Sequence, residues 1–162
     1  MPRTKLIPDS DIHAALLSLL RNEGEKAITF SALSRATGLA PATLVQRFGS
    51  LDGMLVSALI AGWQQAEAEL ESAEAVELGP KGALPFLKSL PDVTVLLAPS
   101  LRNPDLRDQA FAWRQRAEAG LALRLEQDKA APLVFALWAA QAQWKDIGPK
   151  GFKWKEALKS IT

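Results

Sequence analysis

The stretch from Thr29 to Phe48, TFSALSRATGLAPATLVQRF, decides our interpretation of the fold. Thr29 is a favourable N-cap for a helix over 30–37, and Gly38 stands where a residue in the left-handed conformation would end that helix. Pro41 is tolerated in the first turn of a second helix that continues through Phe48. Two short helices separated by a glycine turn are the arrangement of a helix-turn-helix.

The apolar and the polar residues of this stretch fall on different faces of the two predicted helices. The positions expected to pack the helices together, and onto the helix before them, are Leu33, Ala36, Leu39, Leu44 and Phe48. The positions expected to stay exposed are Ala40, Ala42, Thr43, Gln46 and Arg47. Small and hydrogen-bonding side chains suit a helix that enters the major groove of DNA. The same spacing fits an ordinary three-helix bundle, so spacing alone leaves both interpretations open.

Helical periodicity continues on both sides of this stretch. A first helix is indicated by apolar residues spaced three and four apart, which are Ile12, Ala15, Leu16, Leu19 and Leu20. Asp9 or Ser10 is expected to cap this helix, and Gly24 is expected to end it. Ser50 is expected to cap a longer helix from Leu51 to about Glu71.

The rest of the chain is predicted to be helical as well. The stretch 72–82 is acidic and then rich in glycine and proline, so we interpret it as a loop. Two short helices are expected over 83–90 and 92–98, with Pro99 closing the second. Longer helices are expected from Asn103-Pro104 to Leu125, over 131–145 and over 152–161. Because no alternation typical of β-strands occurs, the predicted fold class is all-α.

The composition excludes several kinds of functional site. The 162 residues include no cysteine, which removes disulfides, thiolate catalysis and cysteine-bound metals, and the single histidine, His13, provides no cluster for zinc. The first residues lack a signal-peptide core, and the longest nearly apolar run, 130–140, is about half of a membrane span. We therefore expect a cytoplasmic protein with no bound cofactor and no membrane segment. Phosphate loops and catalytic carboxylate motifs are missing from the sequence too, so an enzyme is not expected.

Charge is unevenly distributed, although the net charge is only +1. Residues 1–60 hold six Lys or Arg against five Asp or Glu, residues 61–128 seven against eleven, and residues 129–162 six against two. An acidic middle is a poor surface for phosphates, so contact with DNA is expected from an end of the chain. The basic C-terminal positions form either a solvated helix face or a contact for a polyanion; they are Lys145, Lys150, Lys153, Lys155 and Lys159.

Residues from about Pro8 to Trp63 resemble the DNA-binding domain of the TetR family of repressors. The matching features are Gly24, Thr29-Phe30, Gly38-Leu39, Thr43-Leu44 and Phe48-Gly49-Ser50. The segment LVQRFGS is especially similar to members of that family. The resemblance implies a helix-turn-helix DNA-binding domain over 1–50, with the likeness extending to about 63, and an effector-binding and dimerisation domain over 51–162.

The same resemblance implies which residues contact DNA. They are Thr29, Phe30, Ser31, Ala40, Pro41, Ala42, Thr43, Val45, Gln46, Arg47 and Ser50. Hydroxyls and backbone N–H groups at the start of the first helix of the pair are expected to reach phosphates. Thr43, Gln46 and Arg47 are candidates for base edges or nearby phosphates, with the phosphate backbone favoured for Arg47 because it lies late in its helix. Arg3 and Lys5 form either an arm along the DNA or a disordered tail.

Two positions depart from the family pattern. Val45 stands where the family commonly has a tyrosine that contacts phosphate, and Leu51 stands where it commonly has a lysine that does the same. Each lost phosphate contact lowers the affinity rather uniformly across DNA sequences. Val45 has another use, since an apolar side chain can contact the methyl group of thymine. The alternative function is therefore a ligand-binding or protein-interaction module of the same fold with weak or lost DNA binding.

The C-terminal part resembles the family in layout alone. That layout implies an effector pocket with apolar walls, for which the candidates are Trp63, Phe86, Leu90, Phe111 and Trp113. It also implies a dimer interface made by the helices over 131–145 and 152–161, for which the candidates are Val134, Leu137, Trp138, Ala142 and Trp144. An intramolecular core is the alternative interpretation of both sets.

Together these features predict a transcriptional regulator, in particular a repressor that a small-molecule effector releases from its operator. A homodimer is expected because one short recognition helix contacts too few bases to be selective. The expected partners are double-stranded operator DNA, an unknown effector for which apolar walls favour a hydrophobic molecule, and a second copy of the chain.

Overall fold

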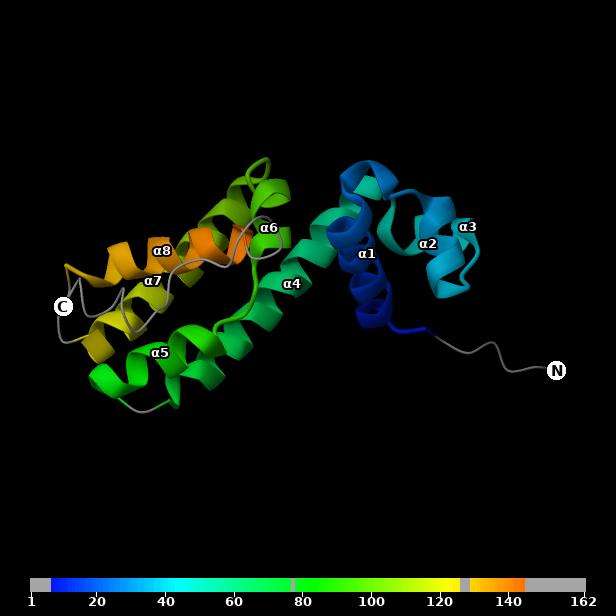
Figure 1. Cartoon of the computed structure of the whole chain (residues 1–162). Coiled ribbons are helices and arrows are strands. Elements are labelled where there is room, and N and C mark those ends of the chain that lie inside the picture. The colour runs from blue at the N-terminus through cyan, green and yellow to red at the C-terminus, as the bar shows by residue number, and fades with distance from the viewer. Residues whose placement is uncertain (1–6, 77, 126–128, 145–162) are drawn as a thin grey trace. The chain divides into compact units, whose positions relative to one another are not determined.

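The structure, a computed structural model, describes residues 7–76, 78–125 and 129–144 (Figure 1). In these ranges every regular element is a helix, which confirms the predicted all-α class. The elements are α1 (Asp9–Glu23), the 3-10 turn η1 (Glu25–Ala27), α2 (Phe30–Thr37), α3 (Pro41–Phe48), α4 (Leu51–Glu74), α5 (Pro80–Ser89), α6 (Thr94–Ser100), α7 (Pro104–Leu125) and α8 (Ala131–Trp144). Three predictions lie outside the described residues: the arm with Arg3 and Lys5, the basic positions from Lys145 onward, and the helix over 152–161.

The chain divides into two compact units. One, which we call the head, contains residues up to 64 together with 95–106; the other, which we call the body, contains 65–94 and the residues from 107 onward. Both α4 and α7 contribute residues to both units. A segment distant in sequence, which includes most of α6, is thus part of the head. The functional division after residue 50 stays a prediction.

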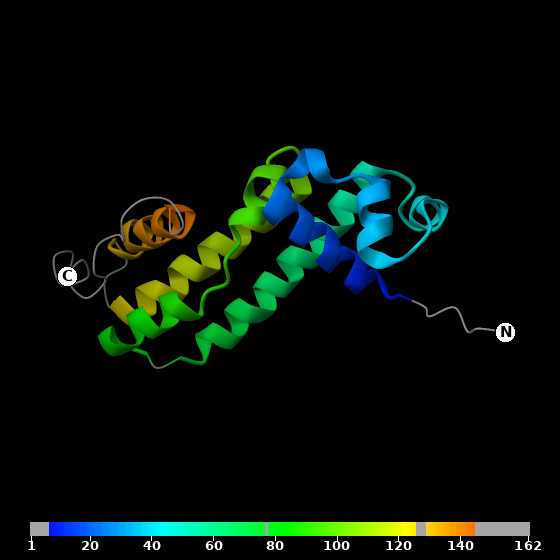
Figure 2. The ribbon, with the colours of Figure 1, turned by 45° about the vertical axis from the view of Figure 1, so that its right-hand side comes forward.

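A core of aliphatic side chains holds the first helices of the head together. The buried residues are Ile12, Leu16 and Leu20 of α1, Leu33 of α2, Leu44 of α3, and Met54, Leu55, Ala58 and Leu59 of α4. Full burial of one such side chain stabilises a fold by roughly 1.5–3 kcal/mol. Of the other residues expected to pack here, Leu39 and Phe48 are half-buried and Ala36 is exposed. Figure 2 shows α1 against the first part of α4. A side-chain contact joins these two helices, since His13 Nε2 lies 2.9 Å from Ser57 Oγ.

The ends of the helix-turn-helix are set by residues next to them in the sequence. Thr29 Oγ1 accepts a hydrogen bond from the backbone N–H of Ala32 at 3.0 Å, which confirms the predicted cap of α2. Gly38 has a φ of 75° in the left-handed region and ends α2, also as predicted. Ser50 Oγ accepts from the N–H of Gly53 at 2.9 Å and caps α4.

The start of α1 differs from the prediction. The N-cap position is Pro8, in an extended conformation, and no side chain caps the helix there. Asp9 and Ser10 are already helical, so their side chains are past the position from which an N-cap bonds back to the helix. Asp9 and Asp11 instead place negative charge in the first turn, where the helix dipole favours it.

The end of α6 also differs from the prediction, since the helix includes Pro99 and ends at Ser100. The physical reason is the hydroxyl of Ser100, which donates to the carbonyl oxygen of Leu96 at 2.7 Å and so supports the last turn. The same hydroxyl accepts from Trp63 Nε1 at 3.0 Å. The bond from Trp63 to Ser100 ties α6 to α4 within the head.

The body packs the last part of α4, α5, α7 and α8 together. Trp113 Nε1 donates to the carbonyl oxygen of Ala66 at 3.1 Å, which ties α7 to α4. The ring of Trp113 lies edge-on to that of Phe135 on α8, with 6.2 Å between centroids. On α7, Gly120 lets α5 approach closely, because a Cβ at this position would lie 2.8 Å from Phe86 Cζ.

A buried arginine closes the C-terminal end of α4. Arg124 donates to the carbonyl oxygens of Glu74 at 3.0 Å and Val76 at 2.7 Å, and to that of Gly120 at 2.7 Å. Its guanidinium carbon lies 4.2 Å from the centroid of the Phe86 ring. Burial lowers the pKa of Arg124, and the nearby Glu74 carboxylate opposes that shift. The last carbonyl oxygens of a helix have no hydrogen-bond donor within the helix, and Arg124 supplies one to Glu74.

The predicted loop over 72–82 is shorter than expected. Arg124 bonds to the carbonyl oxygen of Glu74, the last residue of α4, and the helix continues three residues past the predicted end. Pro80 is the first residue of α5, a position where the missing N–H of proline costs nothing. The irregular connection is therefore limited to the residues between these two helices.

In the described ranges no single helix is both long and apolar enough to cross a membrane. Among the described helices, the pair α3 and α4 taken together passes the same criteria of length and hydropathy, but it is bent by 68° at the break.

Candidate nucleic-acid interface

The outer face of α3 is a low, exposed surface made mainly of small side chains. The exposed residues, all among those predicted to contact DNA, are Ala40, Pro41, Ala42, Val45 and Gln46, and Thr43 is half-buried. Val45 keeps 42% of its surface in spite of its apolar side chain. Buried Leu44 holds the opposite face of the helix in the core. Such a surface can approach base edges closely and offers Gln46 as a hydrogen-bonding group.

The start of α2, the helix that precedes α3, presents exposed hydroxyl groups. Thr29 and Ser31 are exposed, while Phe30 is half-buried. Thr29 Oγ1 accepts a hydrogen bond as a cap, and a hydroxyl that accepts one bond can still donate its own hydrogen. The same holds for Ser50, which is exposed and caps α4. Capping the helix and contacting phosphate are therefore compatible for these residues.

The departure at Leu51 has a local explanation in the head. Leu51 is the first residue of α4 and is half-buried, so it contributes apolar surface where the family commonly has a lysine. A half-buried leucine brings no charge to a phosphate. The exposed face of α3 therefore offers hydrogen-bonding and small side chains and carries no charged side chain.

Arg47 differs from its neighbours on α3, because its guanidinium is bound within the protein. Nη1 donates to the carbonyl oxygen of Ile7 at 2.6 Å and contacts Asp9 Oδ1 at 3.2 Å. The side chain is 23% exposed. The assignment of Arg47 to base edges or phosphates stays a prediction, and Nη1 is already bonded within the protein.

His13 lies where α1 meets α3 and α4. Its Nε2 is 2.9 Å from Ser57 Oγ, and its ring centroid is 5.7 Å from that of Phe48. Burial lowers the pKa of His13, and the charge of Asp9 raises it by less. These contacts place His13 in the packing between α1, α3 and α4.

The candidates for an effector pocket are mainly interior side chains. Trp63 is buried in the head, where Ser100 accepts from its indole N–H. In the body, Phe86, Leu90 and Trp113 are buried, whereas Phe111 is exposed to solvent. The alternative interpretation, an intramolecular core, accounts for the three buried residues of the body. An effector pocket at these positions stays a prediction.

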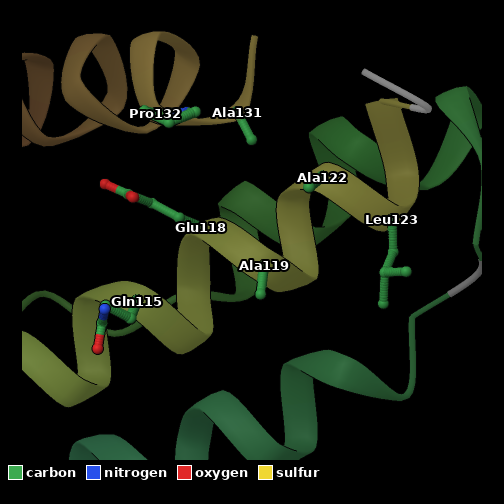
Figure 3. A pocket seen from close by; sticks show the side chains of 7 residues that line it. All are labelled: Gln115, Glu118, Ala119, Ala122, Leu123, Ala131 and Pro132. Carbon is green, nitrogen blue, oxygen red and sulfur yellow. The ribbon is translucent and has the colours of Figure 1, made fainter. Parts of the chain in front are cut away.

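An open cleft of about 540 Å³ lies in the body between α7 and the start of α8 (Figure 3). Its walls are Gln115, Glu118, Ala119, Ala122 and Leu123 of α7, with Ala131 and Pro132 of α8. Glu118, at one wall, is paired with Arg114 at 2.7 Å. The cleft is therefore lined mainly by apolar side chains, and its polar groups are Gln115 and the neutralised carboxylate of Glu118.

The dimer candidates on α8 divide into two groups. Val134 is completely buried in the body, so it belongs to the core of its own chain. Leu137, Trp138 and Ala142 are half-buried, and Trp144 is exposed. Leu133, which the sequence did not single out for this interface, is exposed as well. A dimer through this helix stays a prediction, with Val134 outside its contact surface.

Two solved structures share the arrangement of this chain over nearly all of its length. PfmR, a TetR family transcriptional regulator from Thermus thermophilus, has a TM-score of 0.66 and 20% sequence identity, and the match covers 92% of this chain and 93% of PfmR. The chain has the TetR fold. SCO7518, a proposed transcriptional regulator from Streptomyces coelicolor, shares it with a TM-score of 0.67 and 16% identity over 94% of each chain. No protein-family model and no curated protein matches the sequence.

Within this TetR fold, sequence reasoning missed two features. The tie between Arg47 and the start of α1 joins residues 40 positions apart, and no local pattern announces it. The α7–α8 cleft has a weak signal in Ala119, Ala122 and Leu123, which follow the helical spacing of an exposed face. Small residues on a predicted exposed face indicate such a cleft only when the neighbouring helix is known.

Proposed function

We propose that this protein is a DNA-binding transcriptional regulator and that the outer face of α3 contacts the bases. The observation that carries the proposal is the pairing of a buried face with an exposed one on the same short helix. Leu44 anchors α3 in the core, while Ala42, Val45 and Gln46 remain exposed. A helix held this way can enter a major groove while its buried face stays packed in the core.

The groups available at this face suggest how recognition is divided. The hydroxyls of Thr29, Ser31 and Ser50 suit phosphates, which fix the position of the protein on the duplex. The amide of Gln46 suits the adenine edge, and the methyl groups of Val45 suit a thymine methyl. With few charges at the face, binding should depend on salt less steeply than in proteins with many phosphate contacts.

Regulation through a dimer and an effector is the finer part of the proposal. Half-sites one helical turn apart, about 34–36 Å, require two recognition helices and hence two copies of the chain. A hydrophobic effector that prefers another spacing of the two heads would release the operator by its differential affinity. The exposed apolar side chains of α7 and α8 support a second copy or such a ligand on the body.

The experiment is fluorescence anisotropy with a duplex from the upstream region of this gene and a scrambled duplex of the same composition, over a salt series. We expect selective binding that weakens as salt rises. Gln46→Ala should lower the affinity for the selected duplex about tenfold. This is the expected scale because a good side-chain contact to a base contributes roughly 1–3 kcal/mol of discrimination. Gln64→Ala is the matched control, because Gln64 is an exposed glutamine on α4 of the same unit.

The competing proposal is a ligand-binding or protein-interaction module that has lost DNA binding. It is favoured by the apolar side chains at Val45 and Leu51, where the family commonly has phosphate-binding groups. Negligible binding of every duplex at low salt would support it and would contradict the regulator. Equal binding of the two duplexes, unchanged by Gln46→Ala, would also rule out base contact by α3.

A further inference from the structure

The last turn of α3 is fastened to α1 at two consecutive residues. Arg47 Nη1 bonds to the carbonyl oxygen of Ile7 at 2.6 Å and to Asp9 Oδ1 at 3.2 Å. Phe48 lies against the ring of His13, at 5.7 Å between centroids. Both contacts are on the side of α3 away from its exposed face. We call the bonds of Arg47 to Ile7 and Asp9 the Arg47 tie.

The Arg47 tie joins a charged donor to acceptors that suit it. A guanidinium carries several N–H groups, and hydrogen bonds that involve a charged group are stronger than neutral ones. The tie spans 40 residues of sequence, so it constrains how α3 lies against α1 and not how either helix folds. Arg47 is the less exposed partner, at 23% against 59% for Asp9.

Gln46, the residue before Arg47, has its side chain exposed to solvent and not bonded to α1. Gln46 is exposed on the outer face, whereas Arg47 points back to the start of α1. A rotation of α3 about its axis would move Gln46 and break the tie at the same time. The orientation of the recognition face and the bonds of Arg47 are therefore coupled by geometry.

We infer that Arg47 is a positioning residue for DNA recognition, which sets the orientation of the α3 face through Ile7 and Asp9 and does not itself contact phosphate. The inference rests on the proposed function, because it needs α3 to bind DNA. It also gives Asp9 a role in addition to its favourable charge in the first turn of α1.

Salt dependence separates this role from a phosphate contact. Removing an arginine that neutralises a phosphate lowers the slope of log K against log salt by about one. Removing a positioning arginine leaves that slope unchanged and lowers the selectivity between duplexes. Asp9 provides the second criterion: deleting a carboxylate strengthens binding to DNA if only charge matters, and weakens it if the tie matters.

The test compares Arg47→Ala, Asp9→Ala and the exposed control Arg21→Ala by anisotropy over a salt series, with the selected and the scrambled duplex. We expect Arg47→Ala to lower the affinity for the selected duplex about tenfold, comparable to the loss of one charged hydrogen bond, with an unchanged salt slope. Asp9→Ala should weaken the same binding by a smaller factor, because the bond to Ile7 remains. Arg21→Ala should leave the selectivity between the two duplexes as it is in the wild type.

Circular dichroism at the assay temperature verifies that each variant is folded. If Arg47→Ala unfolds, Arg47→Met keeps the aliphatic stem and removes only the charge and its bonds, and it replaces the alanine variant. A decrease of the salt slope by about one, with Asp9→Ala binding as well as wild type or better, would overturn the inference in favour of a phosphate contact. Unchanged affinity and selectivity in folded Arg47→Ala would overturn it in favour of a purely structural tie.

The wild-type protein distinguishes failure of this inference from failure of the proposed function. Absence of selective binding by wild type refutes the function and the inference with it. Selective binding by wild type, combined with either contradicting result for Arg47, refutes the inference alone.

Discussion

The outer face of α3 in the head and the α7–α8 surface of the body are opposite in character. On α3 the exposed side chains are small or polar, and Val45 is the one large apolar residue of this helix counted among the exposed ones. On the body, Leu123 at the open cleft is 66% exposed, and Trp144 at the end of α8 is 63% exposed. Large apolar side chains left in water mark surfaces that bind protein or apolar ligands, whereas a small polar helix face suits a DNA groove. The two surfaces therefore fit different partners.

Leu44 and Val45 give the largest expected effect, because adjacent residues of α3 face the core and the solvent. Leu44→Ala should lower the free energy of unfolding by about 2–5 kcal/mol, since it leaves a cavity in the head. Val45→Ala should change it by less than about 0.5 kcal/mol. Urea denaturation followed by circular dichroism measures both variants. Similar losses for the two variants would mean that α3 has no free face.

Arg124 and Arg116 compare a buried with a partly exposed arginine in the body. Arg124→Met should cost about 1–3 kcal/mol of unfolding free energy, because the carbonyl oxygens of Glu74 and Val76 lose their buried donor. Arg116→Met removes a partly exposed ion pair with Glu74 and should cost less than about 1 kcal/mol. Denaturant titration of the two variants decides the order, and a larger loss for Arg116 would contradict this account of the end of α4.

The exposed apolar residues of the body predict which substitutions weaken the proposed dimer. Leu133→Glu should raise the dissociation constant of the proposed dimer at least about tenfold, because a charge would be buried in an apolar contact. Val45→Glu is the matched control in the head and should leave the dimer intact. Sedimentation equilibrium measures both. A dimer that tolerates the change at Leu133 would place its interface elsewhere.

The smallest expected effect concerns pH and belongs to the head. Burial lowers the pKa of His13 in the folded protein, so the unfolded chain takes up a proton more readily. Stability should therefore be full above the unfolded value of about 6.5 and fall as the pH drops from there toward the lower folded pKa. His13→Gln should remove this component, which is assignable because the chain has a single histidine. A melting temperature with the same pH dependence in wild type and variant between pH 7.5 and 5.5, roughly the range of histidine titration, would contradict it.

Local signals predicted the head far better than the body. The cap at Thr29, the left-handed Gly38 and the buried Leu33 and Leu44 all follow from residues close in sequence. The predicted cap of α1 was wrong. The N-cap position is Pro8 in an extended conformation, and a proline can precede a helix without any side-chain cap. Helix ends set by distant residues, such as the end of α4 under Arg124, leave no pattern in their own neighbourhood.

The candidate site was predictable for the same reason, with one exception. The exposed positions of α3, Ala42, Val45 and Gln46, follow from helical spacing once Leu44 is placed in the core. Arg47 has the residue type of a DNA contact, but whether a long side chain points outward or back to α1 depends on acceptors 40 residues away. Sequence spacing assigns a face to a residue and cannot assign a direction to a flexible side chain.

Hydrogen–deuterium exchange with and without the selected duplex tests most directly that the two surfaces bind different partners. Amide exchange reports protection segment by segment along the chain. We expect slower exchange on DNA binding in residues 40–47 and at the start of α2, with no change in residues 115–123 of α7. Protection of residues 115–123 without any change in α3 would contradict the central claim and would place DNA on the body.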